Sequence, residues 1–402
     1  MRIGRSRGFW VAATMYALFL FASSTPSPLY VVYQAEWHFS SITLTTIFAV
    51  YVLALLLALL FAGSLSDSIG RRPTLLTAGA IQLTALVAFA LAPGVVWLGI
   101  ARVLQGVATG LATAALSAWL LDLQPADRPG RGATVSSLAP AAGLGLGALA
   151  TGLLVQYAPA PTHLVYWLLV GTFVLGTFAL AALPETVEAR PGWLRELRPS
   201  VGVAPSARTA FLAAVPCLVA VWALSGFGMS LGGSVTADVL HTRNHVVGGL
   251  VVLALFGTAF LATLATRRVD ARPTMLAGCV FLVIGMAGAV VAIHIASAAL
   301  FFLGCAVAGL GFGPAFTAAF RTVVALAPPS GRAALVAAIF VVSYLAFSVP
   351  AVIAGVAITH VGLVTTATWY GAALIALCLA ALVAMRRPAR DPEVVADRVP
   401  VG

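Results

Sequence analysis

Most residues that could do chemistry in this sequence interrupt long apolar stretches. The segment GSLSDSIGRRPTLL, residues 63–76, places one acid, two arginines, two glycines and a proline between two such stretches. Glycine permits a sharp reversal of the backbone, and Pro73 suits the first turn of a following helix. The segment therefore predicts a tight turn in which Asp67 and Arg71 stand ready to form an ion pair.

Arg102 is different, because it lies inside an apolar run, in the stretch ARVLQGVATG of residues 101–110. It stands about six residues, or roughly 9 Å of helix, from the nearer end of that run. If the run spans a bilayer, an ionised arginine at this depth is costly and usually functional. The alternative is a long side chain that only reaches back to the interface.

A proline-rich part of the first apolar run offers Arg102 a binding surface. The segment PSP, residues 26–28, lacks two backbone donors, which frees carbonyl groups near Ala22 and Ser24. A guanidinium has five donors to give to such groups. We therefore expect Arg102 to dock on this part of the first helix, with Tyr30 close by.

The elements that position these residues follow from composition. Of the 402 residues, 61% are hydrophobic and 8% are charged, and the mean hydropathy is +1.05, which no single soluble core accommodates. Apolar runs of about 20 residues, enough to cross a bilayer as a helix, recur along the whole chain. The sequence predicts an all-α membrane protein with twelve transmembrane helices, at 9–33, 43–63, 74–92, 96–121, 133–156, 164–183, 211–233, 246–265, 274–294, 298–322, 333–357 and 365–385.

The arginines indicate the orientation of these helices. With the N-terminus in the cytoplasm, all of the 22 basic residues except Arg102 and Arg243 fall in cytoplasmic loops and tails. Both termini are therefore predicted to be cytoplasmic, and the basic start of the chain belongs to a retained first helix rather than to a cleaved signal. The positive charge sets orientation and meets lipid, so no nucleic-acid partner is expected.

The chain divides into two similar halves. RRPTLL at 71–76 returns as ARPTML at 271–276, and two further matches share an offset of about 200 residues. The predicted units are an N-terminal six-helix bundle at 1–183, a cytoplasmic linker at 184–210, a C-terminal six-helix bundle at 211–385 and a cytoplasmic tail at 386–402.

Glu36 and Asp238 are the only acids on the predicted outer side, and no carboxylate falls at the bilayer centre. They occupy matching places in the two halves, and Glu36 is expected about three residues beyond the end of the first helix. If protons are coupled to transport, Glu36 exchanges them with water while Arg102 responds to its charge. The alternative is that both acids are ordinary solvated loop residues.

The turn resembles the signature loop of the major facilitator superfamily, GxLxDxxGRR. The stretch from Arg102 to Gly110 is similar to the arginine motif of that family, RxxQG followed by a small residue. The resemblance covers the whole chain and implies two bundles that rock about a central cavity. It also implies a cytoplasmic gate made of Gly63, Asp67, Gly70, Arg71, Arg72 and Asp122.

A third motif is partly present in the fifth helix. APAAGLGLGALATG, residues 139–152, resembles the Gly- and Pro-rich motif of drug:proton antiporters, but has alanine where the family has glycine before Pro140. The alternative interpretation is close helix packing through small residues.

The predicted substrate cavity is uncharged and partly aromatic, which favours a lipophilic or neutral solute. We expect a secondary active transporter that exports lipophilic small molecules or drugs by alternating access, with protons as the candidate coupling ion. The alternatives are a uniporter or symporter of a small neutral solute such as a sugar, and a non-transporting receptor or enzyme of the same fold. No ATP-binding loop, nucleophile elbow or HExxH string is present, so we expect no enzyme, cofactor or metal. We expect a monomer in a bacterial plasma or inner membrane, with cavity residues Tyr30, Gln105, Thr109, Trp222, Met229, Phe316 and Tyr344.

Overall fold

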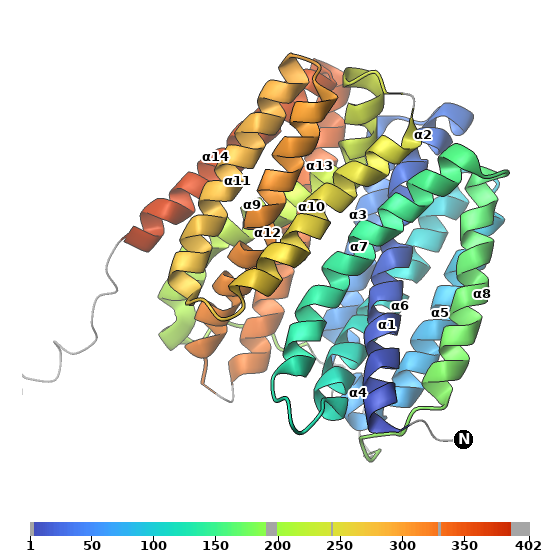
Figure 1. Cartoon of the computed structure of the whole chain (residues 1–402), viewed down its shortest axis with the longest axis vertical. Helices are drawn as coiled ribbons and strands as arrows, with labels where there is room; N and C mark the ends of the chain where they lie inside the picture. The colour runs from blue at the N-terminus through green and yellow to red at the C-terminus, as the bar shows by residue number, and fades with distance from the viewer. Residues whose placement is uncertain (1–3, 190–198, 243, 329–330, 387–402) are drawn as a thin grey trace, which may run out of the picture.

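The computed structural model describes residues 4–189, 199–242, 244–328 and 331–386, and within these ranges the chain is helical without strands. Twelve helical spans in this part of the chain are long and apolar enough to cross a membrane. The protein is therefore a multi-pass membrane protein of the all-α class (Figure 1). The predicted tail from 387 onward and residues 190–198 of the predicted linker lie outside the described residues.

The helices of the two halves follow each other along the chain (Figure 1). The N-terminal half contains α1 (Arg5–Ser24), α2 (Pro26–Trp37), α3 (Ser41–Ala62), α4 (Leu65–Ser68), α5 (Arg71–Ala90), α6 (Val95–Leu123), α7 (Arg131–Tyr157) and α8 (Pro161–Ala181). The C-terminal half contains α9 (Pro205–Ser234), the π-helix η2 (Val235–Val239), α10 (His245–Thr266), α11 (Ala271–His294), α12 (Ala298–Ala325), α13 (Arg332–Val361) and α14 (Leu363–Arg386).

The first and seventh spans differ most from the sequence prediction. The first span is interrupted at Thr25, between α1 and α2, because Pro26 cannot donate to the preceding turn. This span continues to Trp37, so Glu36 lies in the last turn of α2, and the prediction that it lies beyond the helix is wrong. The seventh span begins at Pro205, six residues before the predicted start at 211, because proline is well suited to a first helical turn.

The same packing device recurs in both halves. Gly106 and Gly110 of α6 face backbone carbonyls of α3, at distances that leave no room for a Cβ atom. Gly309 and Gly313 of α12 face carbonyls of α10 in the same way. Small residues four positions apart let membrane helices approach closely. The repeated device is structural support for the internal symmetry that the sequence indicates.

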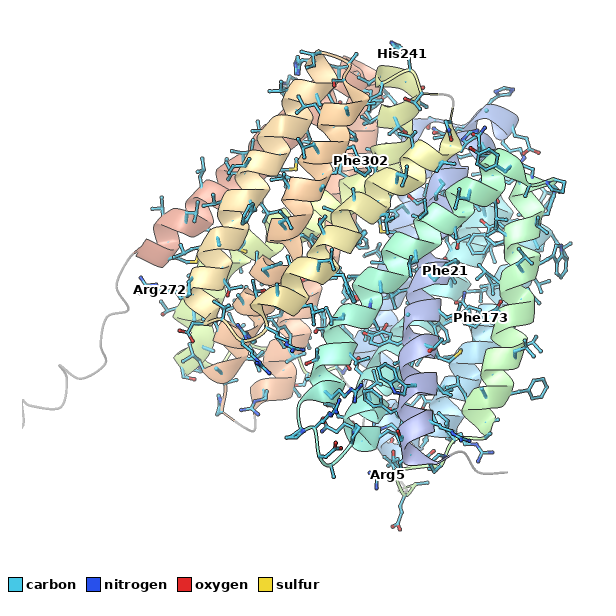
Figure 2. The ribbon with its side chains drawn as sticks, in the orientation of Figure 1. Arg5, Phe21, Phe173, His241, Arg272 and Phe302 are labelled. Atoms are coloured by element: carbon cyan, nitrogen blue, oxygen red, sulfur yellow. The ribbon has the colours of Figure 1, made fainter. Side chains whose placement is uncertain are left out.

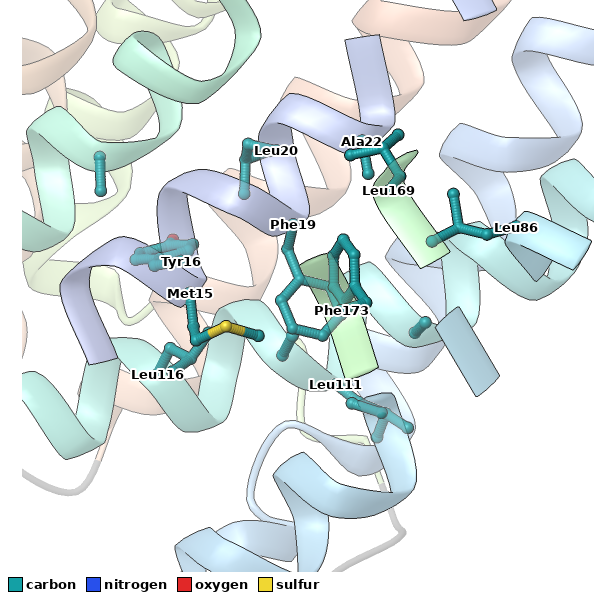
Figure 3. Packing of buried hydrophobic residues seen from close by; sticks show 14 of the residues in the cluster. Met15, Tyr16, Phe19, Leu20, Ala22, Leu86, Leu111, Leu116, Leu169 and Phe173 are labelled. Carbon is teal, nitrogen blue, oxygen red and sulfur yellow. The ribbon is translucent and has the colours of Figure 1, made fainter. Parts of the chain in front are cut away.

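The core of the N-terminal half is built around α1. Phe19 of α1 meets Phe173 of α8 edge to face, with ring centroids 5.0 Å apart (Figure 3). Met15 packs where Gly176 of α8 leaves space, and Leu116 of α6 lies on the other side of Met15 (Figure 3). These contacts pack α1 against α6 and α8.

The two halves meet along two pairs of helices, α7 against α10 and α3 against α13. Two hydrogen bonds cross this boundary: Ser27 Oγ donates to the Met229 carbonyl at 2.5 Å, and the His245 backbone N–H donates to Gln156 Oε1 at 2.9 Å. Figure 2 shows Arg5 and Arg272 at one end of the molecule and His241 at the opposite end. This is the end predicted to face outward.

Candidate functional site

Arg102 is fully buried in the N-terminal half, and its guanidinium is held by hydrogen bonds from several directions. Nη1 donates to the Ser23 carbonyl at 3.0 Å and to Gln105 Oε1 at 2.7 Å. Nε donates to Tyr30 Oη at 2.9 Å, and Nη2 donates to the same oxygen. The expected docking of Arg102 beside Tyr30, on the proline-opened part of the first helix, is therefore what the structure contains.

Gln105 completes this contact with the interrupted helix. Its side-chain Nε2 donates to the Ala22 carbonyl at 2.9 Å. In an unbroken helix that carbonyl accepts from the residue four positions later, which here is Pro26 and has no N–H. The glutamine therefore satisfies a carbonyl that the proline leaves free. Thr109, one turn further along α6, is also buried and lies 3.3 Å from Ser23 Oγ.

Aromatic rings surround the guanidinium where polar groups do not. The Arg102 Cζ lies 4.9 Å from the ring centre of Tyr51, 5.4 Å from that of Tyr30 and 6.0 Å from that of Phe89. Such faces attract a cation in a dry site. Within the described residues no carboxylate pairs with Arg102, so carbonyls, a hydroxyl and ring faces hold its charge. Sequence reasoning missed Tyr51 and Phe89, because nothing local marks which aromatic residues of α3 and α5 face α6.

Glu36 lies on the same helix as Tyr30. Tyr30, Tyr33 and Glu36 are spaced three residues apart, so Tyr33 neighbours both of the others, while Glu36 lies about a third of a turn around the helix from Tyr30. The hydroxyl of buried Tyr33 donates to that of Tyr166 at 3.3 Å, and Glu36 is exposed. Asp238, in η2, is exposed as well, and neither acid has an ion pair in the described part of the chain.

The loop after α3 forms a charged cluster around Arg71, as the motif predicts. Arg71 pairs with Asp67 through Nη1 and with Asp122 Oδ2 through Nε, the second at 3.1 Å. Arg71 Nη1 also donates to Ser66 Oγ at 2.7 Å. Arg71 is mostly buried, whereas the Asp67 side chain is 58% exposed. The structure brings these residues together, and their role as a gate stays a prediction.

Glu185 is a member of this cluster that the sequence did not reveal. Its carboxylate accepts from the backbone N–H groups of Arg71 at 3.0 Å and Arg72 at 2.8 Å, which caps the start of α5. Gly70 has φ +103°, and a Cβ atom there meets the same carboxylate. Glu185 falls within the predicted linker at 184–210. Its binding partner lies more than 100 residues away in the chain, so no local sequence pattern reveals the contact.

The second copy of the loop is built differently. Asp270 makes no ion pair in the described residues, and Arg272 donates to the Met385 carbonyl at 3.1 Å. Arg321 donates to the carbonyls of Arg267 and Val269. Here arginines bind backbone oxygens, so the charge cluster exists in the N-terminal half alone among the described residues.

Aromatic side chains from α9, α12 and α13 form a closed ring in the C-terminal half, which we call the five-ring cluster. Each ring contacts the next, with centroids between 5.1 and 6.3 Å apart. Phe347 joins it to the N-terminal half, because its ring meets Trp222 at 5.5 Å and Phe48 of α3 at 5.0 Å. The cluster consists of Trp222, Phe316, Phe320, Phe340 and Tyr344.

The residues predicted to line one cavity lie in three places. Tyr30, Gln105 and Thr109 are buried beside Arg102, whereas Trp222, Phe316 and Tyr344 belong to the five-ring cluster. Met229 is buried as well and lines an apolar cavity of about 50 Å³ between α9, α10, α11, α12 and α14. The five-ring cluster and the buried arginine are therefore in separate halves.

The third motif has a packing role in this structure. A Cβ atom at Gly143 meets the Ala17 carbonyl, and one at Gly147 meets the Phe21 carbonyl, so α7 lies directly on α1. Gly152 lies against the His245 carbonyl of α10. The described residues contain no group of three or more His, Cys, Asp or Glu that could hold a metal ion.

Comparison with known proteins agrees with this architecture. The family model of the Major Facilitator Superfamily matches residues 12–351. A solved structure of a mutant peptide transporter POT with alafosfalin has a TM-score of 0.74 and 15% identity, covering 94% of each chain. A second, with sulfate, has a TM-score of 0.77 and 14% identity, covering 94% of this chain and 93% of that one. Identities this low show the fold alone, and no curated protein matches the chain.

Proposed function

Since the chain belongs to the Major Facilitator Superfamily, we propose that it is a secondary transporter that exports lipophilic small molecules by alternating access in exchange for protons. The observation that carries this proposal is the separation of Arg102, fully buried in one half, from the uncharged five-ring cluster in the other. A site of ring faces suits a lipophilic body.

The likeness to peptide transporters does not by itself favour a peptide substrate. A peptide carries an ammonium and a carboxylate, and both need charged or strongly polar partners when they leave water. The residues of the five-ring cluster are uncharged, and the Arg102 guanidinium already donates to Tyr30, Ser23 and Gln105. These contacts leave little for a peptide terminus and favour a neutral lipophilic solute.

The proposed role of Arg102 is to couple the outer end of α2 to the substrate site. Arg102 donates hydrogen bonds to Ser23 of α1 and to Tyr30 of α2. It therefore binds the helix on both sides of the interruption at Thr25. Glu36 lies about two turns beyond Tyr30 on α2. A change in its charge alters the electric field along α2 and therefore the relative strength of the Arg102 hydrogen bonds to α1 and to α2. We infer that Glu36 exchanges protons with outer water and that Asp238 is its counterpart on η2.

The gate proposed for the cytoplasmic side is the cluster of Asp67, Arg71 and Asp122, helped by Gly63, Gly70 and Arg72. The exposed Asp67 pair is worth about 0.2–1 kcal/mol, which biases the population of two states without locking either. We place the protein in a bacterial plasma or inner membrane as a monomer, with a small molecule and protons as its partners.

The test is a drug-susceptibility panel in an efflux-deficient bacterium, compared with uptake of radiolabelled sugars by the same cells. Export predicts higher resistance to neutral lipophilic compounds and lower accumulation of them, with loss of both when the proton gradient is collapsed. Uptake of a sugar without any change in resistance contradicts export and supports the uniporter or symporter alternative. Resistance that survives collapse of the gradient contradicts proton exchange.

A further inference from the structure

The five-ring cluster presents ring faces in the middle of the membrane-spanning region. Trp222 lies just past the midpoint of α9, and it is partly exposed, as are Phe316, Phe320 and Phe340. Rings that only fill a core are covered on all sides, whereas these keep open surface. The link from Phe347 to Phe48 places the cluster at the boundary with the N-terminal half.

The cluster also contains a hydrogen-bond donor without an acceptor. Trp222 Nε1 is buried, and no described residue accepts a hydrogen bond from it. An indole N–H is a donor only, so what it lacks is an oxygen or nitrogen lone pair. A buried donor left unpaired costs free energy, and a ligand that supplies the acceptor recovers that cost.

The surroundings limit the charge of such a ligand. The neighbours of Trp222 are the rings of Phe316, Tyr344 and Phe347, and within the described residues no acid pairs with a group in the cluster. A ligand cation gains ring faces but leaves the N–H unpaired, since a cation without a lone pair supplies no acceptor. A neutral ligand with an acceptor uses both the faces and the donor.

We propose that the five-ring cluster binds a flat, neutral aromatic molecule whose carbonyl or ether oxygen accepts a hydrogen bond from Trp222 Nε1. The inference rests on the proposed function, since it names the substrate class of the same transport site. The ring faces supply affinity for any flat apolar ligand, and the indole N–H favours those ligands that carry a hydrogen-bond acceptor.

The test uses two ligands of one shape, 9-fluorenone, which has a carbonyl oxygen, and fluorene, which does not. Binding of each radiolabelled compound to the purified full-length protein is measured in detergent, with empty micelles subtracted. The parent is expected to prefer fluorenone by about tenfold, the effect of one neutral hydrogen bond in a dry site. Trp222→Phe keeps a ring and removes the N–H, so the preference should disappear while fluorene binding stays.

Trp119→Phe is the matched control. Trp119 Nε1 is likewise buried without a partner in the described chain. Unlike Trp222, however, Trp119 on α6 is fully buried and has no exposed ring surface. This variant should keep the tenfold preference. Phe316→Leu removes one ring of the cluster and should weaken both ligands equally, which keeps the test informative if Trp222→Phe folds poorly.

Three outcomes overturn the inference: an unchanged preference in Trp222→Phe, no binding of either ligand by the parent, or tighter binding of tetraphenylphosphonium, a cation without an acceptor. The proposed function fails separately. The parent protein could bind fluorenone while cells that express the protein accumulate as much fluorenone as control cells. In that case the export function is wrong and the binding site stands. If cells export fluorenone and Trp222→Phe keeps the preference, export stands and the role of Trp222 is wrong.

Discussion

Arg102 is buried in the N-terminal half, whereas Cys305, its match in the C-terminal half when the glycine pairs of α6 and α12 are aligned, is uncharged. The loop after α3 and its second copy before α11 also differ in how their arginines are paired. Arg71 pairs with two carboxylates in the first half, whereas Arg272 of the second copy and Arg321 of α12 donate to backbone carbonyls.

The scaffold of the two halves is nevertheless the same. The glycine pairs of α6 and α12 pack on α3 and α10 in matching ways, and each half contributes six of the twelve spans. A duplicated bundle therefore kept its packing while its polar groups diverged. The proposed function assigns coupling and gating to the charges of the N-terminal half, and substrate recognition to the uncharged rings of the C-terminal half.

The largest expected effect comes from Arg102→Lys. The lysine keeps the positive charge but cannot reach Tyr30, Ser23 and Gln105 with one planar group. Losing even one charge-assisted hydrogen bond corresponds to at least about tenfold in rate, so transport should fall by that factor or more. Initial efflux rates at equal membrane expression measure this. Arg102→Ala, in contrast, leaves its partners unpaired and should also lower the thermal stability in detergent.

If both Arg102 variants export normally, the coupling role is wrong. If Arg102→Lys loses stability and efflux in parallel, Arg102 is a structural tie. In that case the N-terminal half does not differ from the C-terminal half in the way proposed.

The next effect concerns the shared scaffold, and it should be equal in the two halves. A Cβ atom at Gly106 meets the Tyr51 carbonyl, and one at Gly309 meets the Leu255 carbonyl, both in close helix contacts. Gly106→Ala and Gly309→Ala should each destabilise the protein by about 1–3 kcal/mol through overpacking. Thermal unfolding in one detergent measures both. A large effect in one half with none in the other contradicts equivalent packing. Gly99→Ala, where a Cβ atom meets nothing within 4 Å, is the control.

The smallest effect is expected at the loops. Asp67→Asn removes one partner of Arg71 at an exposed position, which is worth about 0.2–1 kcal/mol, or roughly 1.4- to fivefold in transport. Asp270→Asn, which changes the acid of the second copy, should change little, since Asp270 has no ion pair in the described residues. Cysteine accessibility from the cytoplasm reports the gate directly. An accessibility unchanged by Asp67→Asn rules out the gating role.

The sequence predicted the helices and the two halves well because spanning a bilayer needs about 20 apolar residues, and that length is visible locally. It also predicted the contact of Arg102 with the first helix, because proline removes a donor wherever it stands. Local patterns of this kind need no knowledge of the fold.

Contacts between distant segments were beyond the sequence. Glu185 caps a helix that starts 114 residues earlier, and Tyr51 covers Arg102 from another helix. The sequence assigned Tyr30, Gln105 and five other residues to one cavity, but they lie in three places, since helical periodicity gives a face but not its neighbour. The role of Glu36 depended on a helix end, and ends are the least certain feature of a sequence prediction.

The central claim is that the N-terminal half couples and the C-terminal half recognises, and one paired measurement tests it. The dissociation constant for 9-fluorenone in detergent and the saturated transport rate in proteoliposomes are determined for the parent, Arg102→Lys and Trp222→Phe. We expect Arg102→Lys to bind like the parent and to transport at least about tenfold more slowly. Trp222→Phe should bind about tenfold more weakly and transport at the parental rate when saturated. The claim is contradicted if Arg102→Lys loses affinity in step with rate, or if Trp222→Phe loses its saturated rate with unchanged affinity.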